Sequence, residues 1–172
     1  MTPRAPFDLG PIPSGLAMVT TDDLVVRATP RAVYDVVVDV ARWPERLGHY
    51  RFVRFRENDG AGGGIVEMAA NRPFGPLNWP TWWLSDMQVI DSRPAIRFRH
   101  IGGVTSGMEV EWSFAPHGNG GTLVRVLHVW NGPRWPIVGR FAAVGVIGPV
   151  FIHGIASLTL SGLAAIAEQG ER

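Results

Sequence analysis

Residues Thr29 to Tyr50 have the sequence T-P-R-A-V-Y-D-V-V-V-D-V-A-R-W-P-E-R-L-G-H-Y, the segment of this chain that says most about its fold. The Thr29 hydroxyl can accept a hydrogen bond from a free amide in the first turn of a helix, and Pro30 suits the first helical position. Pro44 cannot continue that helix, which should therefore end near Arg42, where R-W-P-E opens a second one. The segment predicts two short helices in succession.

The first of these helices carries an apolar stripe. Four valines recur at helical spacing, so one face must pack against another element, and a tryptophan at the joint can anchor both helices. The stripe consists of Val33, Val36, Val37 and Val40, and the anchor is Trp43. Two short helices placed after the first strand of a strand-rich chain point to a fold that encloses a cavity.

Composition excludes several classes of function. The chain has 172 residues, with sixteen basic and fifteen acidic side chains and no cysteine. Its length suits a single domain, and without a basic stripe nucleic-acid binding is set aside. The lack of cysteine excludes disulfides and thiolate chemistry and suits a reducing cytoplasm, where we expect the protein to reside.

The N-terminal residues are rich in proline. Prolines interrupt them too often for the apolar run of a signal peptide. We expect residues 1–15 to form a flexible arm or a strap over the body of the protein. Residues 16–172 should then form one ligand-binding domain.

Strand-like segments joined by glycine-rich turns follow the two helices. The clearest is 108–114, in which apolar and polar residues alternate as in a half-buried strand. Three prolines favour a loop over 72–81. The apolar C-terminal segment supplies a long helix to cover the concave face of the sheet. The expected strands of this α+β fold are residues 17–28, 51–56, 65–71, 82–90, 95–101, 108–114 and 123–130.

This order of elements, and the run A-T-P-R-A-V-Y-D-V-V-V-D-V-A-R-W-P-E from Ala28 to Glu45, resemble the helix-grip superfamily. That superfamily contains START lipid-transfer domains, the plant pollen-allergen fold and the polyketide cyclases and dehydratases. The resemblance covers residues 16–168. It implies a seven-stranded antiparallel sheet wrapped around a long C-terminal helix, two short helices after the first strand, and a hydrophobic tunnel between sheet and helix.

Within the superfamily, the bacterial polyketide aromatase/cyclases are nearest in local sequence. Trp43-Pro44-Glu45 followed by Tyr50 resembles their entrance helix and a tyrosine that faces their pocket. The arginine with which those enzymes orient a polyketide would align with Met87, or with Gln88 if the register slips by one residue. This departure weakens the case for cyclase chemistry and leaves the case for a binding tunnel intact.

Alternation along the expected strands gives a set of candidate ligand-binding residues. They are large and mostly apolar with a few polar tips, as a small-molecule pocket requires, although residues of these types also fill ordinary cores. The set comprises Trp43, Tyr50, Met68, Trp83, Ser85, Met87, Met108, Trp112, Val126, His128, Trp130 and His153.

Three of these residues are candidates for catalysis. Tyr50 can donate a hydrogen bond to a ligand carbonyl or enolate, and His128 and His153 can meet across the tunnel as proton shuttles. His100 is a further histidine that can face inward and shuttle a proton. The alternatives are a tyrosine at the rim and two structural histidines. No histidine spacing specifies a metal site and no nucleotide-binding motif is present, so neither a metal nor a cofactor is expected.

The carboxylates are weaker candidates for catalytic bases than the histidines. Glu67 and Asp86 become candidate bases only if their strands run in the opposite register. Glu109 and Glu111 lie on the polar side of the clearest strand, so we assign both to solvent.

The C-terminal third raises the question of membrane and partner contacts. From 141 to 167 only His153 can carry charge, which exceeds the roughly 20 residues of a membrane span, but glycines and hydroxyl residues interrupt the segment. Leu123, Leu127 and Val129 add apolar side chains on the face turned away from the tunnel. We favour a homodimer over peripheral membrane contact. A set of aromatic residues is expected either to form a rim that gates the tunnel or meets lipid headgroups, or to bury its rings between two loops. The set comprises Phe74, Trp79, Trp82, Trp83, Trp130, Trp135 and Phe141.

Three functions remain open from the sequence. The first is binding or transport of a small hydrophobic ligand such as a lipid, a quinone or a polyketide-like aromatic. The second is an enzyme of the polyketide cyclase or dehydratase type that uses Tyr50 and a pocket histidine. The third is an accessory protein whose apolar helix docks on a partner or a membrane.

Overall fold

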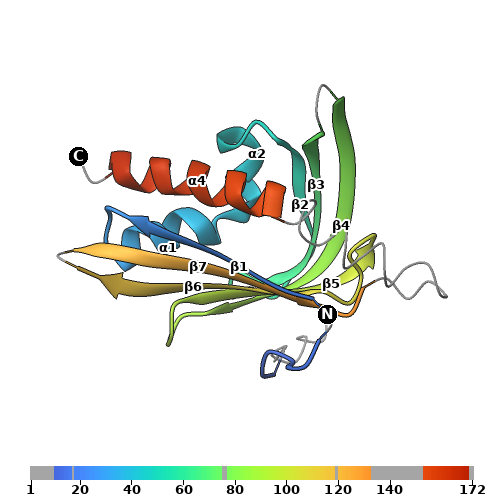
Figure 1. The fold of residues 1–172 in the computed structure, drawn as a ribbon, viewed down its shortest axis with the longest axis horizontal. Coiled ribbons are helices and arrows are strands. Elements are labelled where there is room, and N and C mark those ends of the chain that lie inside the picture. Colours follow the sequence, from blue (N-terminus) through green and yellow to red (C-terminus); the bar gives the residue numbers. More distant parts are fainter. Residues whose placement is uncertain (1–9, 17, 75–76, 119, 133–152, 171–172) are drawn as a thin grey trace.

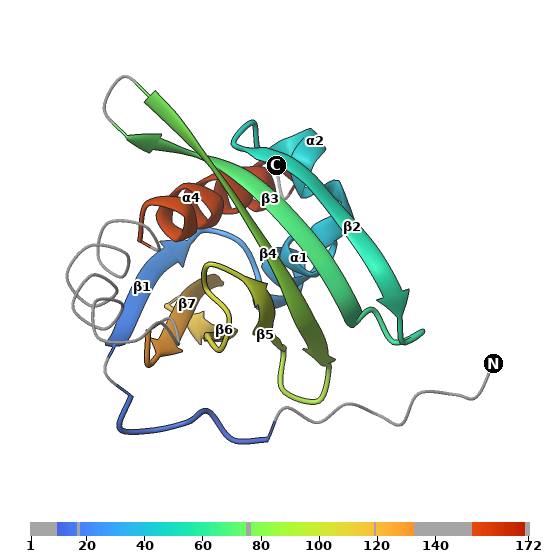
Figure 2. The same cartoon turned by 90° about the vertical axis from the view of Figure 1, so that its right-hand side faces the viewer.

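A computed structural model of the chain describes residues 10–16, 18–74, 77–118, 120–132 and 153–170, with the backbone alone for 72–74, 77–79 and 153. The seven described strands form one antiparallel sheet in the order β1-β7-β6-β5-β4-β3-β2. The sheet curls around helix α4 (His153–Gly170), as Figures 1 and 2 show. The expected α+β fold, a seven-stranded sheet wrapped around a C-terminal helix, is confirmed. The strands are β1 (Met18–Val26), β2 (Tyr50–Asn58), β3 (Gly64–Phe74), β4 (Leu77–Ile90), β5 (Ala95–Gly103), β6 (Glu109–His117) and β7 (Gly121–Trp130).

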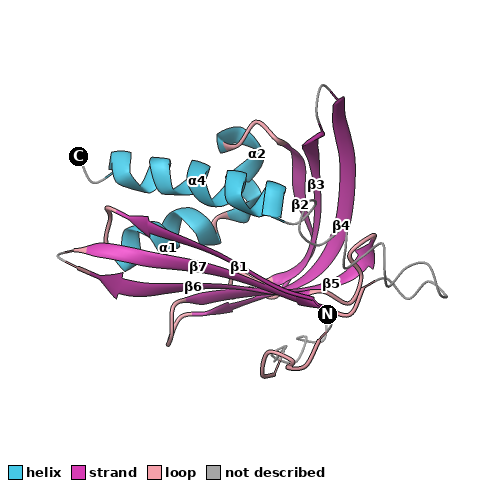
Figure 3. Cartoon of the chain, in the orientation of Figure 1, coloured by secondary structure: helices cyan, strands magenta, loops and turns pink. Residues whose placement is uncertain are grey.

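The two short helices follow β1 as predicted. They are α1 (Pro30–Val38) and α2 (Trp43–Arg46), with a 3₁₀ turn over Val40–Arg42 between them. The Thr29 hydroxyl accepts a hydrogen bond from the amide of Ala32 at 3.3 Å, which caps α1. The valine stripe faces the core, where Val33, Val37 and Val40 are buried. All three described helices lie on the same side of the sheet (Figure 3).

Helix α4 packs tightly against the segment after α2. A Cβ atom at Gly162 would collide with the end of the buried Leu47 side chain, so the absence of a side chain allows the close approach. The residues of α4 that turn to the core are Ala156, Thr159, Leu160, Leu163, Ala164 and Ala167. Within the described part of the chain, no helix is both long and apolar enough to cross a bilayer. Residues 141–152 of the predicted apolar segment lie outside that part.

The prediction of a loop over 72–81 was wrong. Strands β3 and β4 continue through this segment and pair as far as Phe74 and Leu77. The pairing of β2 with β3 stops at Ala70, and that of β5 with β4 begins at Trp83, so the hairpin between them has no third strand beside it. Proline has no backbone N–H to donate, and in this hairpin there is no further strand that would have to accept a hydrogen bond from it. This is why the prolines are tolerated in an extended hairpin, which stands clear of the rest of the sheet in Figure 1.

Part of the outer face of the sheet is also buried. Arg97 and Glu109, which are 3% and 5% exposed, form an ion pair, and Arg99 contacts the same carboxylate. Arg97 also donates a hydrogen bond to the carbonyl of Gly10, so the segment that precedes β1 lies against this face. The assignment of Glu109 to solvent was therefore wrong. Of the predicted arm, residues 1–9 lie outside the described part.

The predicted second apolar surface is only partly present. Val129 is buried, and Leu123 and Leu127 are half-buried. The apolar side chains exposed beside them are Val19 and Val25 of the edge strand β1, which pair with Val129 and Leu123. Homodimerisation stays a prediction.

Candidate functional site

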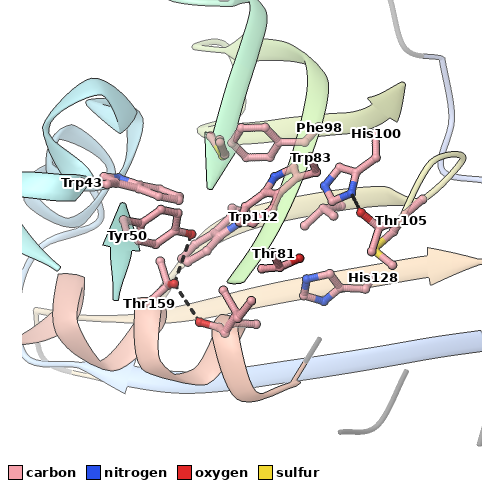
Figure 4. Close-up of a pocket in the computed structure, with 15 residues that line it drawn as sticks. Trp43, Tyr50, Thr81, Trp83, Phe98, His100, Thr105, Trp112, His128 and Thr159 are labelled. Carbon is pink, nitrogen blue, oxygen red and sulfur yellow. Dashed lines mark hydrogen bonds between the residues drawn. The ribbon is translucent and has the colours of Figure 1, made fainter. Parts of the chain in front are cut away.

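A cavity lies between the sheet, α2 and α4 (Figure 4). About 90 Å³ is open to the centre of a water-sized sphere, several times the roughly 10–15 Å³ that one water molecule needs. The cavity therefore has room for a small molecule. Its lining residues are Trp43, Tyr50, Met68, Thr81, Trp83, Phe98, His100, Thr105, Met108, Val110, Trp112, His128, Ile155, Ala156 and Thr159.

Aromatic rings form one wall of the cavity. The Trp43 ring lies 5.3 Å from that of Tyr50 and 5.9 Å from that of Trp112, and Tyr50 lies 6.2 Å from Trp83, measured between centroids. The Trp43 indole is held in place because its Nε1 donates to the Val37 carbonyl at 3.2 Å, the carbonyl being in the last turn of α1. Trp43 thus anchors the joint between the two helices, as predicted from the sequence, and also forms part of the cavity wall.

One end of the cavity is made polar by two hydroxyl groups. The Thr159 hydroxyl, on α4, lies 3.3 Å from the Tyr50 hydroxyl, on β2, and 2.7 Å from the Ile155 carbonyl. Nε2 of His49, from just before β2, lies 3.0 Å from the Thr159 hydroxyl. Burial raises the pKa of Tyr50 above its ordinary value, against the opposite effect of the Thr159 hydrogen bond. The phenol therefore keeps its proton at neutral pH.

The other end carries two histidines, as Figure 4 shows. Nδ1 of His100 lies 2.6 Å from the Thr105 hydroxyl, and the imidazole stacks on the Trp83 indole. Burial, with a smaller contribution from nearby His128, lowers the pKa of His100 to about 3. His100 is therefore a neutral imidazole at physiological pH, which can donate from one nitrogen and accept at the other.

Among the described residues, the lining contains no aspartate, glutamate, lysine or arginine. An ionised ligand group would be desolvated there without a countercharge, which costs several kcal/mol. The described part of the site can therefore surround an apolar molecule and offer hydrogen bonds at its two ends, but it presents no carboxylate, ammonium or guanidinium group to a charged ligand. Within the described part of the chain, no group of three metal-ligating side chains gathers.

The structure brings most of the predicted site residues together. Those that line the cavity are Trp43, Tyr50, Met68, Trp83, Met108, Trp112 and His128. His153 begins α4, but its side chain lies outside the described part, so its meeting with His128 stays a prediction.

Four predicted residues do not line the cavity, although all four are buried: Ser85, Met87, Val126 and Trp130. Alternation assigned them to the correct face, but that face is longer than the cavity. Met87 and Val126 belong to the hydrophobic core. The Trp130 indole donates to the Ser106 carbonyl at 3.0 Å and so supports the turn that carries Thr105.

The sequence interpretation missed His49, Thr81, Phe98, Thr105, Ile155, Ala156 and Thr159, and it named His100 only as a possible shuttle. Phe98 and His100 were predictable from the sequence, since the alternation of β5 places both on one face. His49 and Thr159 were not, because 110 positions separate them in the chain. The adjacent Trp82 and Trp83 were placed together in a rim, but they face opposite sides of β4: Trp83 lines the cavity, whereas Trp82 is 43% exposed. The other predicted rim side chains, Trp130 apart, are outside the described part.

Sequence and structure comparisons agree with this architecture. The profile of a family described as polyketide cyclase / dehydrase and lipid transport matches residues 26–146. No curated protein matches the sequence.

The solved structures that share the fold include the following three. An aromatase/cyclase from Streptomyces sp. R1128 is 15% identical, with a TM-score of 0.73 over 90% of this chain and 96% of that chain. A protein from Thermus thermophilus is 19% identical, with a TM-score of 0.70 over 90% of this chain and 100% of that chain. A START superfamily protein from Mycobacterium smegmatis is 14% identical, with a TM-score of 0.61 over 88% and 95% of the two chains. The expected relationship to the helix-grip superfamily is confirmed.

Proposed function

The chain belongs to the polyketide cyclase/dehydrase and lipid transport family, and from this premise we propose that it binds a small, uncharged, aromatic molecule in the cavity between the sheet and α4. The single observation that carries the proposal is the composition of the cavity wall. Of the fifteen described lining residues, five are phenylalanine, tyrosine or tryptophan, and none is an aspartate, glutamate, lysine or arginine.

The aromatic wall favours flat ring systems over acyl chains. The rings of Trp43, Tyr50 and Trp112 lie at centroid distances typical of paired aromatic side chains, so a further ring can pack against them. Of the ligands expected from the sequence, a quinone or a polyketide-like aromatic therefore fits better than a lipid. The hydroxyl of Tyr50 at one end and the imidazoles of His100 and His128 at the other suit a molecule with an oxygen atom near each end.

Ligand binding can be tested in two ways. Native mass spectrometry of the purified protein should detect a bound small molecule, and 9-fluorenone, a flat neutral ketone, should quench the tryptophan fluorescence on binding. Fluorenone-2-carboxylate, which has the same rings and a negative charge, should bind at least tenfold more weakly, because the described lining offers it no lysine or arginine.

Two neighbouring tryptophans provide a matched pair of variants. Trp83→Phe should weaken fluorenone binding, since Trp83 lines the cavity, whereas Trp82→Phe should not, since Trp82 faces outward. The proposal would be contradicted if the protein carried no ligand and fluorenone failed to bind, or if both variants behaved alike.

A second function, that of an enzyme, is favoured by one observation: Tyr50 and His128 line the same cavity. A tyrosine that donates to a ligand carbonyl makes the adjacent C–H more acidic, and a neutral imidazole can accept that proton. His100 is a poor base for this step because its pKa is lowered to about 3. His128 is the better candidate.

This second function has its own test. The C2 hydrogens of 1-(2-naphthyl)butane-1,3-dione exchange with D₂O, and NMR can follow the rate. The protein should accelerate the exchange, and Tyr50→Phe or His128→Gln should remove the acceleration without abolishing binding. A bound diketone that exchanged at the rate seen in buffer would identify the protein as a binder without this chemistry.

A further inference from the structure

Three residues, His49, Thr159 and Tyr50, form a row of hydrogen-bonding groups that leads from the half-buried His49 to the cavity. Nε2 of His49 lies 3.0 Å from the Thr159 hydroxyl, which lies 3.3 Å from the Tyr50 hydroxyl. Tyr50 and Thr159 line the cavity, whereas His49 lies behind them. The His49 imidazole also packs on the Tyr50 ring, with centroids 4.8 Å apart, and the amide of Asn71 fixes its main chain by donating to the His49 carbonyl at 2.7 Å. Both rings are thus held in a fixed relation.

Thr159 is the central member of this series of hydrogen bonds, and its one hydroxyl proton has the Ile155 carbonyl, the Tyr50 oxygen and, in one tautomer, Nε2 of His49 within reach. The Ile155 carbonyl lies 2.7 Å away, and the Tyr50 oxygen lies 3.3 Å away. The shorter contact is the usual bond of a helical threonine to the preceding turn. Without a ligand the proton therefore points to Ile155, and the lone pairs of the Thr159 oxygen face His49 and Tyr50.

We infer that His49 and Thr159 are positioning residues that orient and polarise the Tyr50 hydroxyl as the hydrogen-bond donor to an oxygen atom of the ligand. The inference rests on the proposed function, since it requires a molecule in the cavity. It also narrows the ligand to one with a carbonyl or phenolic oxygen at the Tyr50 end.

The bound state follows from the same distances. When Tyr50 donates to the ligand oxygen, the Thr159 hydroxyl turns and donates to the Tyr50 oxygen. His49, with its proton on Nε2, donates to the Thr159 oxygen. The two hydroxyls in this chain then each accept one hydrogen bond and donate one, so the bonds strengthen one another.

The charge states of the two end groups suit this arrangement. Burial lowers the pKa of His49 below its usual value, so the imidazole is neutral and carries one N–H donor. Burial raises the pKa of Tyr50, so the phenol retains the proton that it shares with the ligand. This series of hydrogen bonds therefore strengthens the one from Tyr50 to the ligand and transfers no net proton.

The carbonyl stretch of bound 9-fluorenone measures this hydrogen bond directly. Infrared difference spectra of the whole protein with and without the ketone should show a band at lower wavenumber than in hexane. Tyr50→Phe should return the band toward its hexane position and weaken binding roughly tenfold. A residue with a purely structural role would change the affinity without moving the band.

Paired variants then test the two positioning residues. Thr159→Val and His49→Phe should each reduce the Tyr50-dependent shift by roughly 10–30%, the strengthening that one further bond contributes. Thr159→Ser and His49→Gln keep a hydroxyl and a side-chain N–H donor, so they should restore the wild-type band. Ser161→Ala removes an exposed hydroxyl from the same helix and should leave the band unchanged. Circular dichroism confirms that each variant is folded.

Each outcome decides between the two proposals. If Tyr50→Phe abolishes the shift but Thr159→Val and His49→Phe leave it at the wild-type value, the role of His49 and Thr159 is disproved and the proposed function stands. If the wild-type band lies at its hexane position, Tyr50 is not the donor. If fluorenone does not bind to the wild-type protein, the proposed function is contradicted and the inference fails with it.

Discussion

The indole of Trp83 stacks on the imidazole of His100, with ring centroids 6.1 Å apart and an angle of 23° between the planes. Trp83 comes from β4 and His100 from the neighbouring strand β5. This contact covers one face of the half-buried imidazole, and burial, with a smaller contribution from His128, lowers the pKa of His100 to about 3. A stack in the cavity wall therefore sets the charge state at one end of the site.

This pKa predicts how stability responds to acid. In the unfolded chain the histidine has a pKa of about 6.5, so between that pH and about 3 the unfolded state binds more protons than the folded state. Stability therefore falls as the pH drops below 6.5, by up to about 1.4 kcal/mol per pH unit. Urea unfolding at pH 7 and pH 5 should show His100→Gln losing about 2 kcal/mol less than wild type between the two conditions.

Other groups titrate in the same range, so the difference between the two proteins is the relevant quantity. His117→Gln, which changes an exposed histidine, serves as the control and should follow wild type. If His100→Gln lost as much stability in acid as wild type, His100 would not be held neutral by its burial.

Gly103 ends β5 beside the same tryptophan and allows a second prediction. Its φ angle is +87°, and a Cβ atom there would overlap the backbone of Trp82 and Trp83. Gly60 has a similar φ of +81° but open space around it. Both substitutions by alanine meet the left-handed strain of about 1–2 kcal/mol. Gly103→Ala must in addition displace a neighbouring strand, for a total loss of about 3 kcal/mol or more.

Urea unfolding of the two glycine variants measures the difference. Equal losses for Gly60→Ala and Gly103→Ala would mean that β5 does not approach β4 as closely as the structure shows. A larger loss at Gly103, together with weaker fluorenone binding, would connect the close approach to the shape of the cavity.

The fold was predictable because its determinants are local. The Thr29 cap, the valine stripe and Pro44 all act within one or two helical turns, and alternation along the strands indicates which side chains face inward. The prediction failed for the hairpin around Phe74. A proline is compatible with a strand only where no further strand pairs with it, and the sequence does not show where its neighbours end.

The site was less predictable for a related reason. Alternation selects a face, which is why Trp83, Met108 and His128 were found, but it does not tell where on that face the cavity lies. Met87 and Val126 share the face and belong to the core instead. The contact of His49 with Thr159 depends on how α4 docks into the sheet, and no local pattern encodes that placement.

The cap of α1 provides a third prediction. The Thr29 hydroxyl accepts from the Ala32 amide at 3.3 Å, and without it this donor loses its partner at the start of the helix. Thr29→Ala should lower the free energy of unfolding by about 1 kcal/mol, and Thr29→Ser, which keeps the hydroxyl, should lose much less. Chemical denaturation of the three proteins tests this, and a serine variant as unstable as the alanine variant would show that the hydroxyl is not what matters.

The buried ion pair on the outer face leads to the last prediction. The Glu109 carboxylate is 5% exposed and contacts both Arg97 and Arg99, and Arg97 itself is 3% exposed. Glu109→Gln keeps the shape of the side chain but leaves the buried guanidinium of Arg97 with only the more distant Glu111 carboxylate, 3.6 Å away, as a countercharge. Breaking a buried pair in this way costs about 3–5 kcal/mol, whereas exposed pairs contribute about 0–1 kcal/mol.

Glu45→Gln, which breaks an exposed pair with Arg42, is the matched control. Urea unfolding should therefore separate the two variants by at least about 2 kcal/mol, and a loss at Glu109 no larger than that at Glu45 would mean that water reaches the pair and that the segment carrying Gly10 does not cover this face.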